Sequence, residues 1–63
     1  MPRLTSRQQE LLRLVADGNT NSQIARRLSI TEGTVRTHLE NIYRKLDVSS
    51  RAAAITRASG HPG

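Results

Sequence analysis

The chain has 63 residues, which is enough for one small hydrophobic core but not for two. Its ten basic and five acidic side chains leave a formal net charge of +5, and a small protein this basic favours a polyanionic partner over a merely soluble surface. The lack of Cys excludes disulfides, thiol nucleophiles and zinc fingers, and the lack of Trp and Phe excludes aromatic platforms for single-stranded nucleic acid.

The first two helices are marked by capping boxes. Thr5 is followed at the third position by Gln8, and Thr20 by Gln23, a pattern that satisfies free backbone groups at a helix start. Apolar residues at helical spacing follow each box. The pattern predicts two helices, over about 6–16 and about 21–28.

The third and fourth helices follow from apolar spacing and from caps. Thr31 begins a helix over about 32–46, and Ser49 is expected to cap a helix over about 50–58 that contains an alanine run. At 100° per residue, the apolar side chains of the third helix fall within roughly 60° of one another. This stripe consists of Val35, Leu39, Ile42 and Leu46.

No segment alternates as a strand does, so the chain is predicted to be all-α. We expect a compact four-helix domain over residues 1–58, followed by a disordered tail at 59–63. No apolar run approaches the roughly 20 residues of a membrane span, and no signal peptide is evident, so a cytoplasmic location without a membrane partner is expected. The predicted core is Leu4, Leu11, Leu12, Val15, Ile24, Ala25, Leu28, Ile30, Val35, Leu39, Ile42, Leu46, Val48 and Ile55.

The connection between the second and third helices consists only of Ser29, Ile30 and Thr31. Helices joined so closely must cross steeply, as they do in a helix-turn-helix or in an ordinary corner of a helical bundle. Two features favour the helix-turn-helix. The exposed face of the third helix carries residue types that contact bases and phosphates, and residues 26–57 hold a net charge of +4 against +1 for residues 1–25.

Six motifs with consistent spacing extend from residue 4 to about residue 58. They are Leu4-Thr5-x-Arg7, Leu12-x-Leu14-Val15-Ala16-x-Gly18, Asn21-x-x-Ile24-Ala25-x-x-Leu28, Thr34-Val35-Arg36-Thr37-His38, Asn41-Ile42-x-x-Lys45-Leu46-x-Val48 and Arg51-x-x-Ala54. Together they resemble the LuxR-type (GerE-type) helix-turn-helix domain. The resemblance implies the output module of a bacterial transcription regulator, which binds double-stranded DNA as a dimer paired through its fourth helix and acts at the nucleoid.

The resemblance places base contacts at Arg36, Thr37 and Glu40. Arg36 can reach guanine or a phosphate, and Thr37 can offer its hydroxyl group, or its methyl group to thymine. Glu40 departs from the basic residue of some members. Its carboxylate either accepts a hydrogen bond from cytosine or holds Arg36 or Arg44 in an i,i+4 pair.

Helix N-termini with nearby hydroxyl groups and amides, together with two cations of the third helix, are the expected phosphate contacts. These are Thr20, Asn21, Thr34, Asn41, Arg44 and Lys45. Thr34 is alternatively a capping residue, and Gly33 either lets DNA approach closely or is a neutral surface position. The small side chains of the fourth helix suit a weak dimer interface that forms on DNA, although alanine also simply favours helix. The interface residues are Ala52, Ala53, Ile55 and Thr56.

Catalysis is not expected, because no nucleophile–base pair, metal cluster or phosphate-cradling glycine loop occurs in the sequence. His38 is interpreted as a packing or turn residue, and no metal or other cofactor is expected. RNA polymerase is a candidate further partner. Two alternative functions remain: the promoter-reading region of a sigma factor, which has a similar helix-turn-helix, and a basic protein-interaction module.

Overall fold

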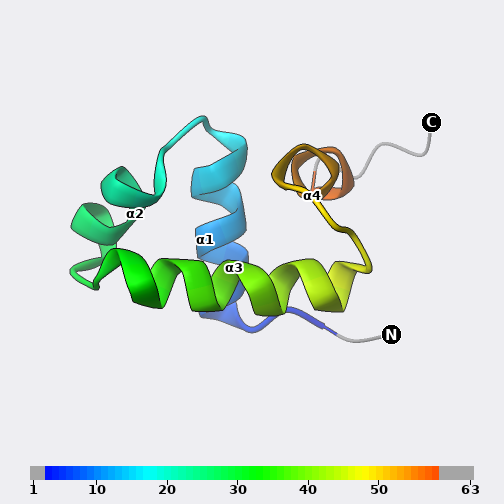
Figure 1. Ribbon diagram of the computed structural model, residues 1–63, viewed down its shortest axis with the longest axis horizontal. Helices are drawn as coiled ribbons and strands as arrows, with labels where there is room; N and C mark the ends of the chain where they lie inside the picture. The colour runs from blue at the N-terminus through cyan, green and yellow to red at the C-terminus, as the bar shows by residue number, and fades with distance from the viewer. Residues whose placement is uncertain (1–2, 59–63) are drawn as a thin grey trace.

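A computed structural model of the chain describes residues 3–58 and shows four α-helices joined by short turns (Figure 1). They are α1 (Ser6–Ala16), α2 (Asn21–Leu28), α3 (Glu32–Leu46) and α4 (Arg51–Ala58). The described part of the chain contains no strand, so the all-α prediction is confirmed. The predicted tail at 59–63 lies outside the described residues.

Both predicted capping boxes form. The Thr5 hydroxyl oxygen accepts from the backbone N–H of Gln8 at 3.1 Å, and Gln8 Oε1 accepts in return from the Thr5 N–H at 2.9 Å. Thr20 and Gln23 exchange the same two bonds, at 3.1 and 2.8 Å. These reciprocal bonds explain why α1 and α2 begin at the residues that the sequence predicts.

The predicted capping residue of α4 was wrong by one position. Ser50, not Ser49, is the capping residue, because its Oγ accepts from the backbone N–H of Ala53 at 3.0 Å. The helix therefore begins at Arg51 rather than at residue 50. Two adjacent serines offer the same hydroxyl group, and the sequence alone does not show which of them caps the helix.

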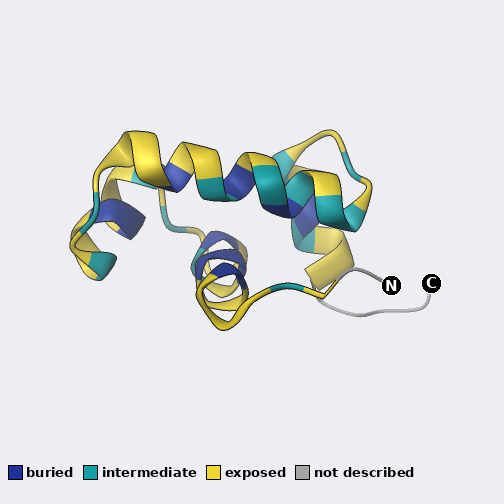
Figure 2. Ribbon diagram, turned by 90° about the horizontal axis from the view of Figure 1, so that it is seen from below, coloured by how far each residue is buried: buried dark blue, intermediate teal, exposed yellow. Residues whose placement is uncertain are grey.

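Helix α3 organises the molecule, because it packs against each of the other three helices. In Figure 2 it forms one edge, with α1, α2 and α4 on its other side, and its outward surface is largely exposed. Helices α2 and α4 each pack on α1 and on α3, but within the described residues they do not pack on each other. None of the described helices is long and apolar enough to cross a membrane.

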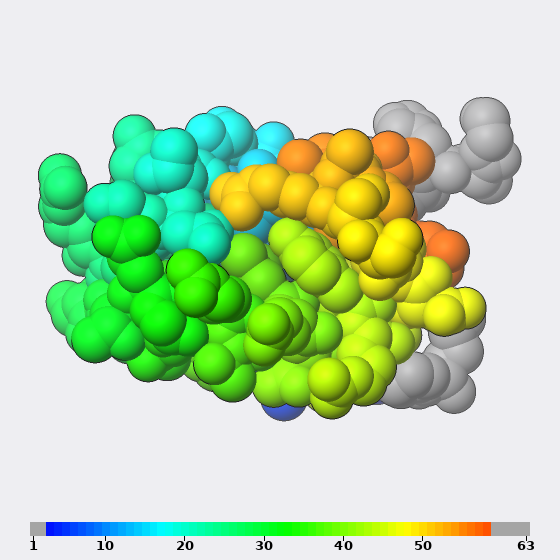
Figure 3. All heavy atoms as spheres, viewed as in Figure 1, coloured from blue at the N-terminus to red at the C-terminus, as the bar shows by residue number. Residues whose placement is uncertain are grey.

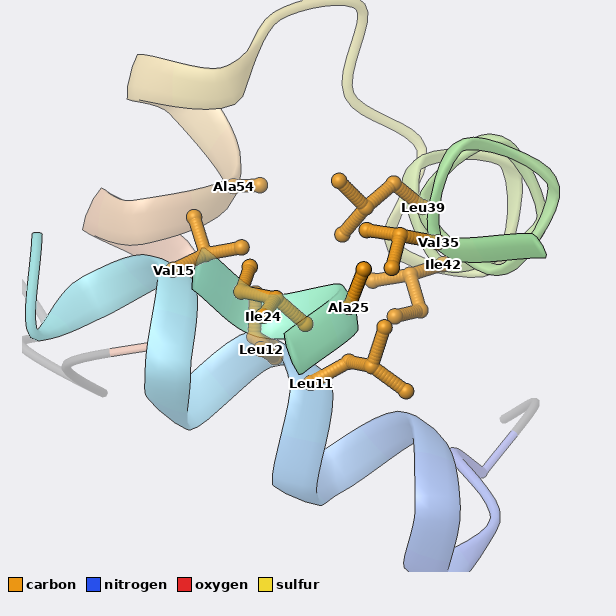
Figure 4. Packing of buried hydrophobic residues seen from close by; sticks show 9 residues of the cluster. All are labelled: Leu11, Leu12, Val15, Ile24, Ala25, Val35, Leu39, Ile42 and Ala54. Carbon is orange, nitrogen blue, oxygen red and sulfur yellow. The ribbon is translucent and has the colours of Figure 1, made fainter. Parts of the chain in front are cut away.

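Nine buried hydrophobic side chains form the core, and Figure 4 shows them converging from all four helices. Eight of the nine were predicted, and the exception is Ala54, which is fully buried. Gln8 is also buried, and its side-chain oxygen is satisfied by hydrogen bonds. Six predicted core residues are only half-buried and pack around this cluster: Leu4, Leu28, Ile30, Leu46, Val48 and Ile55.

Candidate nucleic-acid interface

The turn between α2 and α3 is built by three consecutive residues. Ser29 adopts the left-handed conformation (φ 59°) that ends α2, and Ile30 follows, half-buried against the core. Thr31 then begins α3, because its hydroxyl oxygen accepts from the backbone N–H of Thr34 at 3.1 Å. The turn therefore has the helix-turn-helix geometry that the sequence predicts.

We define the outer face of α3 as its exposed residues Gly33, Arg36, Thr37, Glu40 and Arg44. The only ion pair in residues 3–58 joins two residues of α1, so the alternative pairing of Glu40 with Arg36 or Arg44 is not formed. The Thr37 hydroxyl group donates to the Gly33 carbonyl oxygen at 3.1 Å. The guanidinium of Arg36 and the carboxylate of Glu40 are thus presented to solvent, without a partner on any described helix.

Three of the candidate phosphate contacts lie at the starts of α2 and α3. Thr20 and Thr34 are exposed, and both hydroxyl oxygens take part in helix starts, Thr20 as the cap of α2 and Thr34 through a 2.9 Å bond to the Thr31 hydroxyl group. Asn21 is half-buried, and its Oδ1 accepts from Arg51 at 2.9 Å. Both threonines therefore have a role in the fold that does not depend on a ligand.

The other three candidate phosphate contacts lie on the C-terminal half of α3. The Arg44 guanidinium donates to Asn41 Oδ1 at 3.4 Å on the surface. Lys45 is half-buried, and its ammonium donates to the side-chain oxygen of Gln8 at 2.9 Å and to the backbone oxygen of Arg3 at 3.1 Å. Lys45 therefore also holds the start of α1 against the end of α3.

Arg51 contacts one of the candidate phosphate-contacting residues, Asn21, although sequence analysis assigned it no role. It donates to Asn21 Oδ1 and to the backbone oxygen of Asn19, thirty or more residues away along the chain. The only signal in the sequence was the last of the six motifs, which contains this arginine. A motif does not identify the atoms that a guanidinium will meet.

The fold itself does not require glycine at position 33. A Cβ built there would have its nearest neighbour at 3.8 Å, the Thr31 hydroxyl oxygen, which is an ordinary van der Waals contact. Packing within the free protein therefore does not explain why this position is a glycine.

Helix α4 turns one side to the core and the other to solvent. Ala54 faces inward between α1 and α3 (Figure 4). At 100° per residue, the four candidate interface residues lie on the opposite side, over an arc of about 160°. Ala52 and Thr56 are exposed at the middle of this arc, and Ala53 and Ile55 are half-buried at its edges.

A comparison with protein families identifies this arrangement. The family model described as bacterial regulatory proteins, luxR family, matches residues 2–58. The chain belongs to this family. It is a LuxR-type DNA-binding domain of the kind found in transcription regulators, which is not a class of enzyme.

Individual LuxR-family proteins show the same similarity. The chain is 51% identical over 55 residues to the transcriptional regulatory protein DesR of Bacillus subtilis, covering 87% of this chain and 28% of DesR. It is 45% identical over 51 residues to the nitrate/nitrite response regulator protein NarL of Escherichia coli, covering 81% of this chain and 24% of NarL. The chain thus spans about a quarter of each of these relatives.

A solved structure agrees with the LuxR-type fold. The response regulator ChrA of a heme-sensing two-component system superposes with a TM-score of 0.86 at 45% identity. The match covers 95% of this chain and 31% of ChrA. The LuxR assignment also favours a regulator domain over the promoter-reading region of a sigma factor.

Proposed function

We propose that this domain binds double-stranded DNA in a sequence-specific manner, with α3 in the major groove. The observation that carries the proposal is the outer face of α3, where Arg36, Thr37 and Glu40 are exposed and the two charged groups form no ion pair within residues 3–58. A guanidinium in this position can form two hydrogen bonds with guanine O6 and N7. A free carboxylate can accept a hydrogen bond from the exocyclic amine of cytosine.

Phosphate contacts orient the domain on the duplex in this proposal. They come from the helix starts and from the edge of α3, where donors and cations lie together. Lys45 keeps this role alongside its structural one, because an ammonium has three N–H groups and only two are used within the protein. The contacts are Thr20, Asn21, Thr34, Asn41, Arg44 and Lys45.

Pairing of two copies through α4 completes the proposed complex. In the outward arc of Ala52, Ala53, Ile55 and Thr56, the two alanines and the threonine are small enough to let two helices approach closely, and Ile55 adds an apolar side chain at one edge. In this proposal, residues 1–58 form the DNA-binding domain of a longer regulator. RNA polymerase is a candidate partner of that regulator on chromosomal DNA. The small area of an eight-residue helix predicts weak pairing that becomes complete on adjacent half-sites.

The decisive experiment is selection from random double-stranded DNA by this chain at about 150 mM salt, where weak electrostatic binding is largely screened. Enrichment of two adjacent half-sites is the expected result. Arg36→Ala should lose the preference at one base position of each half-site, whereas Arg13→Ala, on α1, should retain it. Weak binding without sequence preference would instead support a basic protein-interaction module.

A further inference from the structure

Arg51 bridges two helices that do not otherwise pack on each other. Its guanidinium extends from the first residue of α4 to the start of α2, where one nitrogen donates to Asn21 Oδ1 at 2.9 Å. A second nitrogen donates to the backbone oxygen of Asn19 in the α1–α2 turn. In Figure 3, atoms of the gold start of α4 lie against the cyan-green start of α2.

The turn that receives Arg51 is held from several sides. The backbone and side-chain N–H groups of Asn19 both donate to the Leu14 carbonyl oxygen, at 3.1 and 2.9 Å. Asn19 Oδ1 accepts from Arg27 at 3.1 Å, and its backbone oxygen accepts from Arg51. Every polar group of Asn19 therefore has a partner. The backbone oxygen that accepts from Arg51 is consequently held in place by the other hydrogen bonds of the same residue.

The position of Arg51 is unfavourable for a cation considered alone. It lies in the first turn of α4 and beside the first turn of α2, where helix dipoles disfavour positive charge. Within residues 3–58 no carboxylate lies within ion-pairing distance of it. Hydrogen bonds to two oxygens, the backbone oxygen of Asn19 and Oδ1 of Asn21, stabilise it there, and an arginine fork suits such a pair better than a lysine ammonium.

Arg51 also determines the orientation of the Asn21 amide. A guanidinium only donates, so the atom of Asn21 that faces it must be the oxygen. The Asn21 amide nitrogen is consequently the end that remains available, and it lies at the start of α2, among the proposed phosphate contacts. This nitrogen carries two N–H donors, which suit a phosphate oxygen.

We propose that Arg51 is a positioning residue for DNA, which orients the Asn21 amide N–H groups towards a phosphate and ties this contact to α4. The inference rests on the proposed function, because it assigns a task within the same DNA interface. It differs from a direct contact, since Arg51 acts here through Asn21. It also joins the proposed pairing helix to the DNA-contacting end of α2 through one side chain.

Arg51→Lys is the critical variant, because it keeps the charge and loses the fork. Dissociation constants are measured on the duplex recovered by selection and on an unrelated duplex at about 50 mM salt. We expect Arg51→Lys and Asn21→Ala each to weaken binding roughly tenfold on both duplexes, the order of one charge-assisted hydrogen bond. The double variant should bind no more weakly than either single variant, because both remove the same contact. Arg57→Lys, an exposed arginine of the same helix, is the matched control and should bind as the wild type does.

Two further measurements separate positioning from mere stabilisation. Binding is compared at a temperature at which circular dichroism shows every variant folded, so a loss of stability alone leaves affinity unchanged. In the free protein, the side-chain amide resonances of Asn21 should shift in Arg51→Lys and stay in place in Arg57→Lys.

The possible outcomes are distinct. If Arg51→Lys binds like the wild type, or if the two losses add, the positioning role is overturned while the proposed function stands. The same holds if the Asn21 amide resonances do not move. If the wild type binds neither duplex, the proposed function and this inference both fail.

Discussion

The inner and outer faces of α3 differ in burial and in charge. The inner face buries Val35, Leu39 and Ile42, which are 0%, 4% and 0% exposed, against the other three helices. The outer face presents Arg36 and Glu40 to solvent, and neither forms an ion pair with any residue that the structure describes. The inner face therefore carries stability and the outer face is free for binding, so substitutions on the two faces should have separable effects.

The largest effect is expected on the inner face. Ile42→Ala removes a fully buried side chain and leaves a cavity, which should lower the free energy of unfolding by about 2–5 kcal/mol. Such a loss is a large part of the stability of a domain this small. Urea unfolding monitored by circular dichroism measures it. A loss below about 0.5 kcal/mol would contradict the division between the faces.

The second-largest effect is expected on the outer face, where a substitution should change DNA affinity but not stability. Arg36→Ala should weaken binding to the selected duplex by about 1–3 kcal/mol and relax one base position. The urea midpoint should not change, because the side chain is exposed and forms no ion pair within residues 3–58. Fluorescence anisotropy measures affinity, with Arg13→Ala as the control for loss of one charge. An equal loss in the control would assign the effect to net charge and not to a base contact.

A residue at the edge of α3 should show both effects. Lys45→Met removes two hydrogen bonds that link α3 to the start of α1, at a cost of about 1 kcal/mol in stability. It should also weaken binding to all duplexes alike and lower the salt slope by about one. The neighbouring Arg44→Met should change binding without changing stability. Unchanged stability in Lys45→Met would show that these two hydrogen bonds do not stabilise the fold.

The smallest effect has opposite signs in the free and the bound protein. Gly33→Ala should stabilise the free domain by up to about 1 kcal/mol, because alanine favours helix and its Cβ has room. The same methyl group should weaken DNA binding if the DNA backbone approaches α3 closely. Thermal unfolding and anisotropy together decide this, and unchanged affinity would make Gly33 a neutral surface position.

The features predicted correctly from the sequence are local ones. The starts of α1, α2 and α3 follow from Thr5, Thr20 and Thr31, because a cap and its partner are three residues apart. The stripe of α3 follows from helical periodicity. The start of α4 was misplaced because Ser49 and Ser50 offer the same local chemistry, and only the folded chain distinguishes them.

The features that sequence reasoning missed depend on distant segments. Ala54 is buried because of how α4 is rotated against α1 and α3, and nothing within its own alanine run shows this rotation. Lys45 and Arg51 look like surface cations in the sequence, but their partners lie thirty to forty-two residues away. The outer face of α3 could be predicted because its residues stand about one helical turn apart. The distant contacts of Lys45 and Arg51 could not be predicted in this way.

The scarcity of ion pairs has a consequence for how the domain responds to its surroundings. The net charge is +5, and in residues 3–58 only one cation, Arg7, forms an ion pair with a carboxylate, that of Glu10. Added salt should therefore relieve self-repulsion and favour the folded free domain, while the same salt competes with phosphates and weakens the complex. The phosphates of a DNA duplex would neutralise the excess positive charge that the domain itself leaves unpaired. The stability of the free domain should therefore rise with ionic strength, while its affinity for DNA should fall.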